Sequence, residues 1–313
     1  CCVLCTLYEF GVDLFPKRNK HLYLNPLSCV LLRTDYCPHK FLEFHMYTRK
    51  SASRQGVALN INNPLTLYQA GFSKHRETVF IIHGFNGTAS DRHLQYLRDA
   101  YLSRDFNVIA VDWRPLTRYP CYLHSLINTR LTAQCTAQVY AFITHHGGKR
   151  EKITCVGHSL GAHICGMVSK HLSQKQYRII GLDPARPLIE RKKNHLFRLS
   201  RDDAKVIQVL HTNAGFLGQE DNTGSLNYCI NGGRLQPYCR GNPISMSFSS
   251  HLLLGQCFVQ TQKISWCPLS DGLFGHYGTY AFACRNQRVP YRAQGCFCID
   301  VPFAKHCPFG DIT

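Results

Sequence analysis

The most constraining feature of this sequence is the segment Glu151–Lys170, which reads EKITCVGHSLGAHICGMVSK. An apolar run ends at Gly157, His158 and Ser159 follow, and after Gly161 the pattern becomes helical. Two glycines this close predict a sharp turn from strand to helix, because side chains beside such a turn would clash. The turn would hold the Ser159 hydroxyl clear of the sheet, at a helix N-terminus whose partial positive charge favours a developing anion. A turn chosen only for its geometry would need neither the glycine pair nor the hydroxyl.

Short apolar runs alternate with longer helical patterns through most of the chain. β-Branched and apolar residues fill both alternating positions of these runs, as expected of strands covered on both faces. The predicted strands are Thr78–Phe85, Asn107–Trp113, Lys152–Gly157, Arg178–Asp183 and Lys205–His211. Helices are predicted at Ser125–His146 and Ala162–Leu172. The alternation predicts an α/β fold with crossover connections and a mostly parallel central sheet.

The length of 313 residues suits one large domain or two small ones. No internal repeat, low-complexity tract or Pro/Gly-rich linker divides the chain. We therefore predict an irregular N-terminal extension over residues 1–36. One α/β domain is predicted over residues 37–313, with a cysteine-rich C-terminal end.

The formal net charge of +17 predicts attraction to polyanions. Modest basic clusters occur at 149–152 and 190–201, but aromatic residues are not interleaved with them, which argues against nucleic-acid binding. The interpretation that remains is a solvated basic surface, with contact to an anionic membrane or a sulfated glycan as its alternative. No stretch approaches the ~20 apolar residues of a transmembrane helix.

Seventeen cysteines indicate an oxidising compartment, and therefore secretion. The first residues, CCVLCTLYEF, make a poor signal peptide as they stand, so secretion is inferred from the cysteines. Cys155 and Cys165 flank the serine turn and are predicted to be free core thiols. No pair of short Cys-x-x-Cys clusters appears, which argues against zinc. Asn86 begins the sequence Asn-Gly-Thr, a candidate N-glycosylation site.

A serine becomes a nucleophile at neutral pH only with a base and an acid that orients that base. The order Ser, Asp, His along the chain suits the strand–turn–helix nucleophile. Asp183 ends a predicted strand and is followed by proline, so it is the preferred acid. The other candidates are weaker, because Asp112 precedes the serine in the chain, and Asp202 and Asp203 begin a strand and do not end one.

The base is left open by the residues alone. Histidines that follow Asp183 are His195, His211, His251, His276 and His306. His211 ends a predicted strand and is a genuine rival, whereas His251 lies in a polar, loop-like stretch.

Several motifs together resemble the pancreatic-type lipase superfamily, and look most like insect lipases and wasp-venom phospholipases A1. These motifs are FIIHGFNG, VIAVDW, VGHSLGAHICG, GLDPA, HTNAG, NGGRLQP followed by Cys239, and SSHLL, and they run from about Cys37 to beyond His251. The resemblance implies an α/β-hydrolase fold in which Ser159 is the nucleophile, Asp183 the acid and His251 the base.

The same resemblance implies that the backbone N–H groups of Phe85 and Leu160 form an oxyanion hole. It also suggests a Cys37–Cys121 bridge, and no cofactor is expected. Ser249 stands where the family carries a cysteine two residues before the histidine, so Cys239 must pair elsewhere, with Cys229 or Cys257 as candidates.

The region that resembles the family's calcium site reads HLFRLSRDDA. His195 and Ser200 replace acidic residues there, although Asp203 matches, so no structural calcium ion is expected. No lipid-binding β-sandwich is expected after the α/β domain.

Loop lengths favour phospholipid as the substrate. Only eleven residues separate Cys239 from His251, which leaves little room for a lid, and the stretch His211–Gly224 is also short. A short cover would expose the site to packed phospholipid, so we predict sn-1 hydrolysis by a phospholipase A1 at a lipid interface. The alternatives are a neutral triacylglycerol lipase and a non-catalytic, yolk-type lipid-binding protein with this fold.

Overall fold

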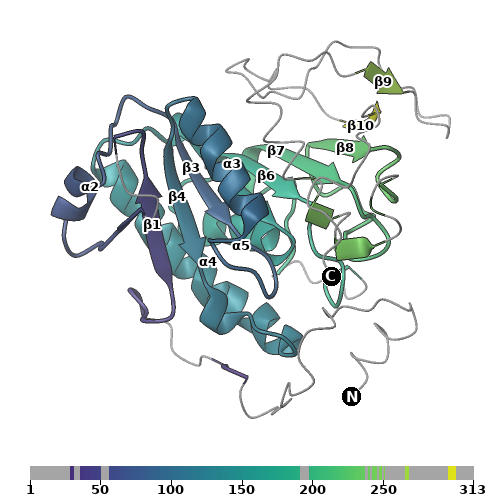
Figure 1. Ribbon diagram of the computed structural model, residues 1–313, viewed down its shortest axis with the longest axis horizontal. Coiled ribbons are helices and arrows are strands. Elements are labelled where there is room, and N and C mark those ends of the chain that lie inside the picture. The colour runs from purple at the N-terminus through teal and green to yellow at the C-terminus, as the bar shows by residue number, and fades with distance from the viewer. Residues whose placement is uncertain are drawn as a thin grey trace.

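A central β-sheet organises the chain in the computed structural model (Figure 1). The structure describes residues 29–31, 36–50, 56–190, 197–236, 239, 242–244, 247–248 and 250, together with the backbone of residues 265–267 and 295–300. Within these residues the sheet has ten strands in the order β2-β1-β4-β3-β5-β6-β7-β8-β10-β9. The strands are β1 (Glu43–Tyr47), β2 (Val57–Ala58), β3 (Thr78–Ile82), β4 (Asn107–Asp112), β5 (Ile153–His158), β6 (Gln176–Leu182), β7 (Ala204–His211), β8 (Leu226–Ile230), β9 (Ser265–Cys267) and β10 (Gly295–Asp300).

Adjacent strands from β4 to β10 pair in parallel, while β1 and β2 at one edge and β9 at the other are antiparallel to their neighbours. The five predicted strands are β3 to β7, with ends shifted by at most a few residues. The predicted α/β fold with a mostly parallel sheet is therefore confirmed.

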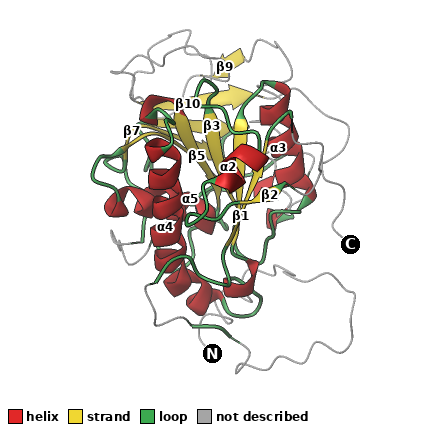
Figure 2. Cartoon of the chain, turned by 90° about the vertical axis from the view of Figure 1, so that its left-hand side faces the viewer, coloured by secondary structure: helices red, strands yellow, loops and turns green. Residues whose placement is uncertain are grey.

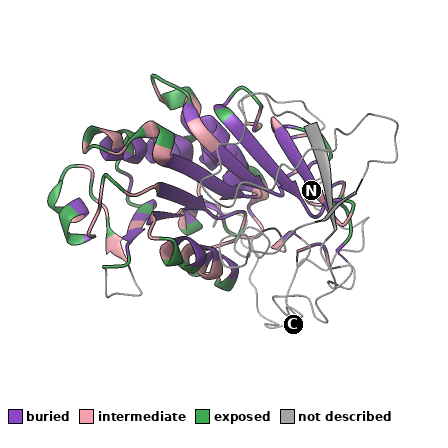
Figure 3. Ribbon diagram, turned by 90° about the horizontal axis from the view of Figure 1, so that it is seen from above, coloured by how far each residue is buried: buried purple, intermediate pink, exposed green. Residues whose placement is uncertain are grey.

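Both faces of the sheet are buried, which is why its strands carry continuous apolar runs (Figure 3). In β3, Phe80 and Ile82 belong to one core cluster, and Val79 and Ile81 belong to the other. Since successive side chains of a strand point to opposite faces, each cluster fills one side of the sheet.

Helices cover both faces, with α4 and α5 on one side and α3 on the other (Figure 2). The α-helices are α2 (Leu65–Gln69), α3 (Arg92–Ser103), α4 (Tyr122–His145) and α5 (Leu160–Val168). The 3₁₀ turns are η2 (Arg114–Leu116), η3 (Arg150–Lys152) and η4 (Ser169–His171). Predicted helix 125–146 is α4, and 162–172 is α5 continued by η4. No helix among the described residues is long and apolar enough to span a bilayer.

The prediction that Cys155 and Cys165 are free thiols is wrong, because they form a disulfide between β5 and α5. The sharp turn folds the helix back onto its own strand, which leaves the two Cα atoms 5.8 Å apart. This separation is within the usual range for a disulfide.

The suggested Cys37–Cys121 bridge is also wrong. Cys37 is bonded to Cys135, and Cys121 is bonded to Cys29. Fourteen residues of helix rise about 21 Å, so a cysteine placed to meet Cys135 cannot reach Cys121. The bond from Cys29 ties part of the predicted N-terminal extension to α4, while residues 1–28 and 32–35 lie outside the described residues.

Candidate active site

Ser159 lies at the tip of the turn between β5 and α5, with φ 53° and ψ −118°. A positive φ is unusual for a residue with a side chain, and such strain persists only where the surroundings enforce it. Its neighbours His158 and Leu160 are buried, whereas Ser159 is partly exposed. The turn therefore presents the hydroxyl, as the sequence predicts, and α5 directs its N-terminus toward it.

The two glycines of the turn are required by close backbone contacts. A Cβ on Gly157 would collide with the carbonyl of Gly161, and a Cβ on Gly161 would collide with the carbonyl of Ile82 on β3. The predicted reason for the glycine pair, backbone segments too close together to admit a side chain, is therefore confirmed.

The loop after β3 reaches Ser159 through another glycine. A Cβ on Gly84 would lie 2.8 Å from the Cβ of Ser159. Phe85 follows Gly84 in this loop, and Leu160 follows Ser159 as the first residue of α5. The two residues predicted to donate amide N–H groups are therefore the chain neighbours of the two residues that meet here. The Phe85 ring packs edge-on against Tyr122, with the ring centres 5.1 Å apart.

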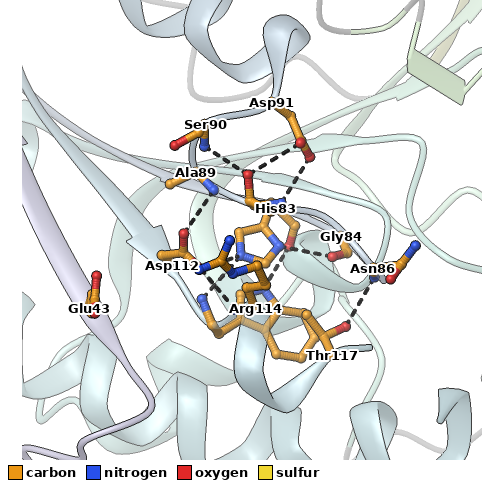
Figure 4. A network of polar contacts seen from close by, with 12 residues as sticks. Glu43, His83, Gly84, Asn86, Ala89, Ser90, Asp91, Asp112, Arg114 and Thr117 are labelled. Carbon is orange, nitrogen blue, oxygen red and sulfur yellow. Dashed lines mark hydrogen bonds and ion pairs between the residues drawn. The ribbon is translucent and has the colours of Figure 1, made fainter. Parts of the chain in front are cut away.

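A buried polar network holds the loop that contains Phe85 (Figure 4). The amide of Trp113 donates to His83 Nε2 at 3.1 Å, so Nδ1 carries the ring proton and donates to the carbonyl of Gly84 at 3.0 Å. The indole N–H of Trp113 donates to the His83 carbonyl at 2.9 Å. Asp112 accepts from the amides of Ala89 and Arg114, at 3.2 and 2.9 Å. The ends of β3 and β4 are thereby joined, which fixes the loop between β3 and α3.

Asp183 lies directly after β6, on the strand next to that of Ser159. The residues before them, Leu182 and His158, are paired in the sheet, and the amide of Ser159 donates to the Leu182 carbonyl at 3.0 Å. The structure therefore brings Ser159 and Asp183 to the same carboxyl edge, where such sheets collect functional groups.

The carboxylate of Asp183 is buried and only partly satisfied. Its Oδ1 accepts from the amides of Thr212 and Asn213, at 3.2 and 3.0 Å, whereas Oδ2 has no hydrogen-bond partner among the described residues. Burial raises the pKa of Asp183, while the nearby Ser247 hydroxyl and the two amides act in the opposite direction. Ser247 Oγ makes its hydrogen bond to His158 Nε2 at 2.9 Å, so Oδ2 keeps no hydrogen bond within the described part of the chain. A buried carboxylate oxygen without a partner is costly, and one further donor would satisfy it.

His251 lies outside the described residues, but residues shortly before it in the chain do not. Ser247 Oγ lies 2.9 Å from His158 Nε2, and the Ser247 carbonyl accepts from Thr212 Oγ1 at 3.5 Å and from Ser250 Oγ at 2.8 Å. Ser250 is fully buried. The segment that leads to His251 is therefore bound at the edge that holds Ser159 and Asp183.

Of the rivals for the base, His211 is already occupied. Its Nδ1 lies 3.1 Å from the Gln219 carbonyl, and its Nε2 lies 3.2 Å from Asn227 Oδ1. Both ring nitrogens thus have structural partners. The remaining rivals, His195, His276 and His306, lie outside the described residues.

The other candidates for the acid, Asp112, Asp202 and Asp203, have different locations or contacts from the one that an acid of the triad needs. Asp112 supports the loop after β3, as described above. Asp202 is exposed, and Asp203 accepts from the amide of Ser200 at 2.8 Å at the start of β7, the end of that strand away from Ser159. Burial raises the pKa of Asp203 to about 6.

In the region that resembles the calcium site, His195 lies outside the described residues, and Asp203 has a partner within the fold. Asp203 Oδ2 accepts from the Ser200 amide at 2.8 Å, and it lies so close to Gly166 that a Cβ there would be 2.6 Å away. In the part of the chain that the structure describes, no three His, Cys, Asp or Glu side chains form a metal-binding group.

Asn86, the glycosylation candidate, is exposed with φ 56°. Its Oδ1 accepts from the amide of Tyr119 at 3.1 Å, and its own amide donates to the Thr117 carbonyl at 2.9 Å. Its modification stays a prediction.

Two features of the site escaped sequence reasoning. The amides of Thr212 and Asn213 bind Asp183, and only the HTNAG motif could have drawn attention to them. Ser247 contacts the serine turn through His158, and nothing in its sequence environment marks it.

Two buried histidines, His93 and His158, are expected to make the folded chain less stable at acid pH. Burial lowers the pKa of His93 to about 4 and lowers that of His158 well below its usual value. The unfolded chain takes up these protons near pH 6.5 and the folded chain does not, so stability falls as the pH drops below about 6.5. We expect His93→Phe, which can keep the stacking on Phe248, to lessen this loss by up to about 1.4 kcal/mol per pH unit.

Urea unfolding at pH values from 7 to 4.5 measures this slope. His75→Gln, at an exposed histidine, serves as the control and should leave the slope unchanged. Equal slopes for the native chain and His93→Phe would show that His93 does not couple stability to pH.

Comparison with known proteins shows the family to which the chain belongs. The family model described as Lipase matches residues 32–306. Phospholipase A1 of Vespula vulgaris is 33% identical over 237 residues, which cover 69% of this chain and 68% of that protein. Lipase member H-A of Xenopus laevis is 37% identical over 199 residues (62% and 42%), and pancreatic lipase-related protein 2 of Sus scrofa is 30% identical over 252 residues (73% and 52%).

The chain thus spans about two thirds of the wasp protein and about half of the two vertebrate proteins. The family match covers most of its residues and agrees with the mostly parallel sheet. The predicted α/β-hydrolase fold and lipid ester hydrolase activity are therefore confirmed, and the chain belongs to the Lipase family.

Proposed function

We propose that this chain is a secreted phospholipase A1 that hydrolyses the sn-1 ester of glycerophospholipids with Ser159, Asp183 and His251. The observation that carries the proposal is the strained, partly exposed Ser159 next to a buried carboxylate with one unsatisfied oxygen. An imidazole N–H is the donor that Asp183 Oδ2 requires, and the segment before His251 is bound at this edge.

In the first step His251 removes the proton of Ser159 Oγ while the oxygen attacks the ester carbonyl carbon. Asp183 stabilises the imidazolium and keeps the ring oriented. The imidazolium then donates its proton to the glycerol oxygen as the ester bond breaks, which leaves an acyl-serine and a 2-acyl lysophospholipid.

The amides of Phe85 and Leu160 are proposed to bind the oxyanion of the tetrahedral intermediate. Leu160 follows Ser159 and Phe85 follows Gly84, which meets Ser159. The hydrogen bonds of His83, Trp113 and Asp112 hold the loop of Phe85 in place before substrate binds. Loss of one such donor typically removes ~3–4 kcal/mol of transition-state stabilisation.

Water attacks the acyl-serine in the second step, with His251 again acting as the base. Fatty acid leaves, and the proton returns to Ser159. The proposed chemistry uses side chains and amides of this chain alone, with no cofactor.

Phospholipid is favoured over triacylglycerol by the short stretches that would cover the site, and by relatives such as the wasp protein that bear the name phospholipase A1. The pancreatic lipase-related relatives support neutral lipid hydrolysis as the second candidate. The three disulfides among the described residues favour secretion.

Two substrates test the proposal: phosphatidylcholine with different labels on its two acyl chains, and a triacylglycerol emulsion. We expect early release of the sn-1 fatty acid and slower release from triacylglycerol. Early time points are needed because the acyl chain of a 2-acyl lysophospholipid migrates. Faster release from triacylglycerol would favour the second candidate, and no release from either would favour the non-catalytic lipid-binding alternative.

A further inference from the structure

Three exposed apolar side chains gather around the first turns of α4. Leu31, Leu123 and Ile127 expose 39%, 51% and 39% of their surface. The Cys29–Cys121 disulfide and a 2.7 Å hydrogen bond from Asn128 Nδ2 to the Val30 carbonyl hold Leu31 beside this helix.

The apolar surface is not explained by packing of α4. Leu123 and Ile127 are four residues apart and share the solvent-facing side of the helix. Further along, the exposed positions of this helix include Gln138 and His145, as expected of a solvated face. Only the beginning of α4 therefore presents large apolar groups to the surroundings.

Three arginines lie close to these apolar residues along the chain, two just before α4 and one on the helix itself. Arg114, Arg118 and Arg130 are exposed, and none forms an ion pair within the described part of the chain. The sequence contains no Asp or Glu from Trp113 to Arg150. We call these six residues, Leu31, Leu123, Ile127, Arg114, Arg118 and Arg130, the docking face.

The docking face borders the candidate active site. The 24 residues of α4 span about 36 Å, whereas a six-residue strand spans about 20 Å, so the start of the helix extends past the carboxyl ends of the strands (Figure 1). Tyr122 packs on Phe85, and the amide of Tyr119 donates to Asn86 Oδ1 at 3.1 Å. A surface that meets these residues would lie next to the loop of Phe85.

We propose that the docking face binds the surface of an anionic phospholipid membrane, with the three apolar side chains inserted between headgroups and the three arginines on phosphates. The proposal rests on the proposed function, because it supplies that site with a substrate surface. An anionic membrane surface attracts nearby basic residues, and removal of apolar side chains from water adds to the binding. A sulfated glycan would use the arginines but would gain little from the leucines and isoleucine.

The experiment measures co-sedimentation with sucrose-loaded vesicles of phosphatidylcholine, with and without 30% phosphatidylglycerol. All variants are made in the Ser159→Ala chain, so that binding is measured without hydrolysis. We expect Leu123→Asp/Ile127→Asp to weaken binding to both vesicles at least tenfold. We expect Arg118→Glu/Arg130→Glu to weaken binding about tenfold, mainly to the vesicles that contain phosphatidylglycerol.

The matched control is Leu65→Asp/Tyr68→Asp on α2, whose side chains are 64% and 85% exposed. This helix lies at the other end of the strands from the docking face. The carbonyl of Ala70, at the end of α2, accepts from Thr48, the residue after β1, and the amide of Ser73 donates to Asn107 at the start of β4. The control should bind both vesicles like its parent. Thermal unfolding midpoints should be equal in all variants, which separates lost binding from lost folding.

Unchanged binding in both docking-face variants would overturn the proposal. So would a result in which only the arginine variant loses affinity and heparin competes with the vesicles, since that pattern indicates a glycan site. The function fails separately: a native chain that binds vesicles in the predicted pattern but releases no fatty acid supports the docking face and contradicts the phospholipase.

Discussion

Replacement of Ser159 by alanine is expected to lower kcat for phospholipid hydrolysis about 10⁶-fold. The reason is that the substitution removes the only atom that bonds to the acyl group and leaves oxyanion donors and binding residues in place. Alanine keeps the Cβ that already tolerates φ 53°, so the fold should persist. Initial rates of fatty-acid release, compared at saturating substrate, measure the effect.

Ser173→Ala, at an exposed serine on the surface, is the control and should retain full activity. A fluorophosphonate probe supplies a second measurement, because only an activated serine reacts with it rapidly. The probe should label the native chain and Ser173→Ala but not Ser159→Ala. Labelling of Ser159→Ala at the native rate would place the nucleophile elsewhere.

The sheet could be predicted because burial of a strand depends on the residues of that strand itself. A strand buried on both faces needs apolar residues at every position, and all five residues of β3 are buried. The serine turn could be predicted for the same reason. Close backbone contacts at Gly157 and at Gly161 exclude any Cβ, so only glycine fits at these two positions, and the glycines can be recognised in the sequence.

The cysteine pairing could not be predicted because it depends on distances between segments far apart in the chain. Cys155 and Cys165 pair only because the turn brings their Cα atoms to 5.8 Å. Cys29 lies in a stretch without periodic pattern, and its bond to Cys121 follows from the path that this stretch takes along α4.

The candidate site shows the same division. Asp183 could be chosen from its place after a strand, but its support by two amides comes from the turn after β7, in register with β6. His211 looked equal to His251 because a histidine at a strand end carries no sign of its partners. Only the contacts with Gln219 and Asn227 show that it is a structural residue.

Asp183→Asn is expected to lower kcat about 10⁴-fold with little effect on the fold. The side chain keeps its shape, and its oxygen can still accept from the amides of Thr212 and Asn213 at the position of Oδ1. The amide NH₂ then occupies the position of Oδ2, where, in the proposed triad, it presents a donor to the imidazole of His251. The ring is forced into the tautomer that cannot accept the proton of Ser159, and the buried negative charge that stabilises the imidazolium is lost.

Asp202→Asn is the matched control, since this carboxylate is exposed at the start of the next strand and should be dispensable. Combination of Asp183→Asn with Ser159→Ala distinguishes a working triad from two independent defects. Residues that act as one unit are not additive, so the double variant should be no slower than Ser159→Ala alone. An additional 10⁴-fold loss in the double variant, or activity within tenfold of native in Asp183→Asn, would separate this carboxylate from the serine and return the role of acid to another residue.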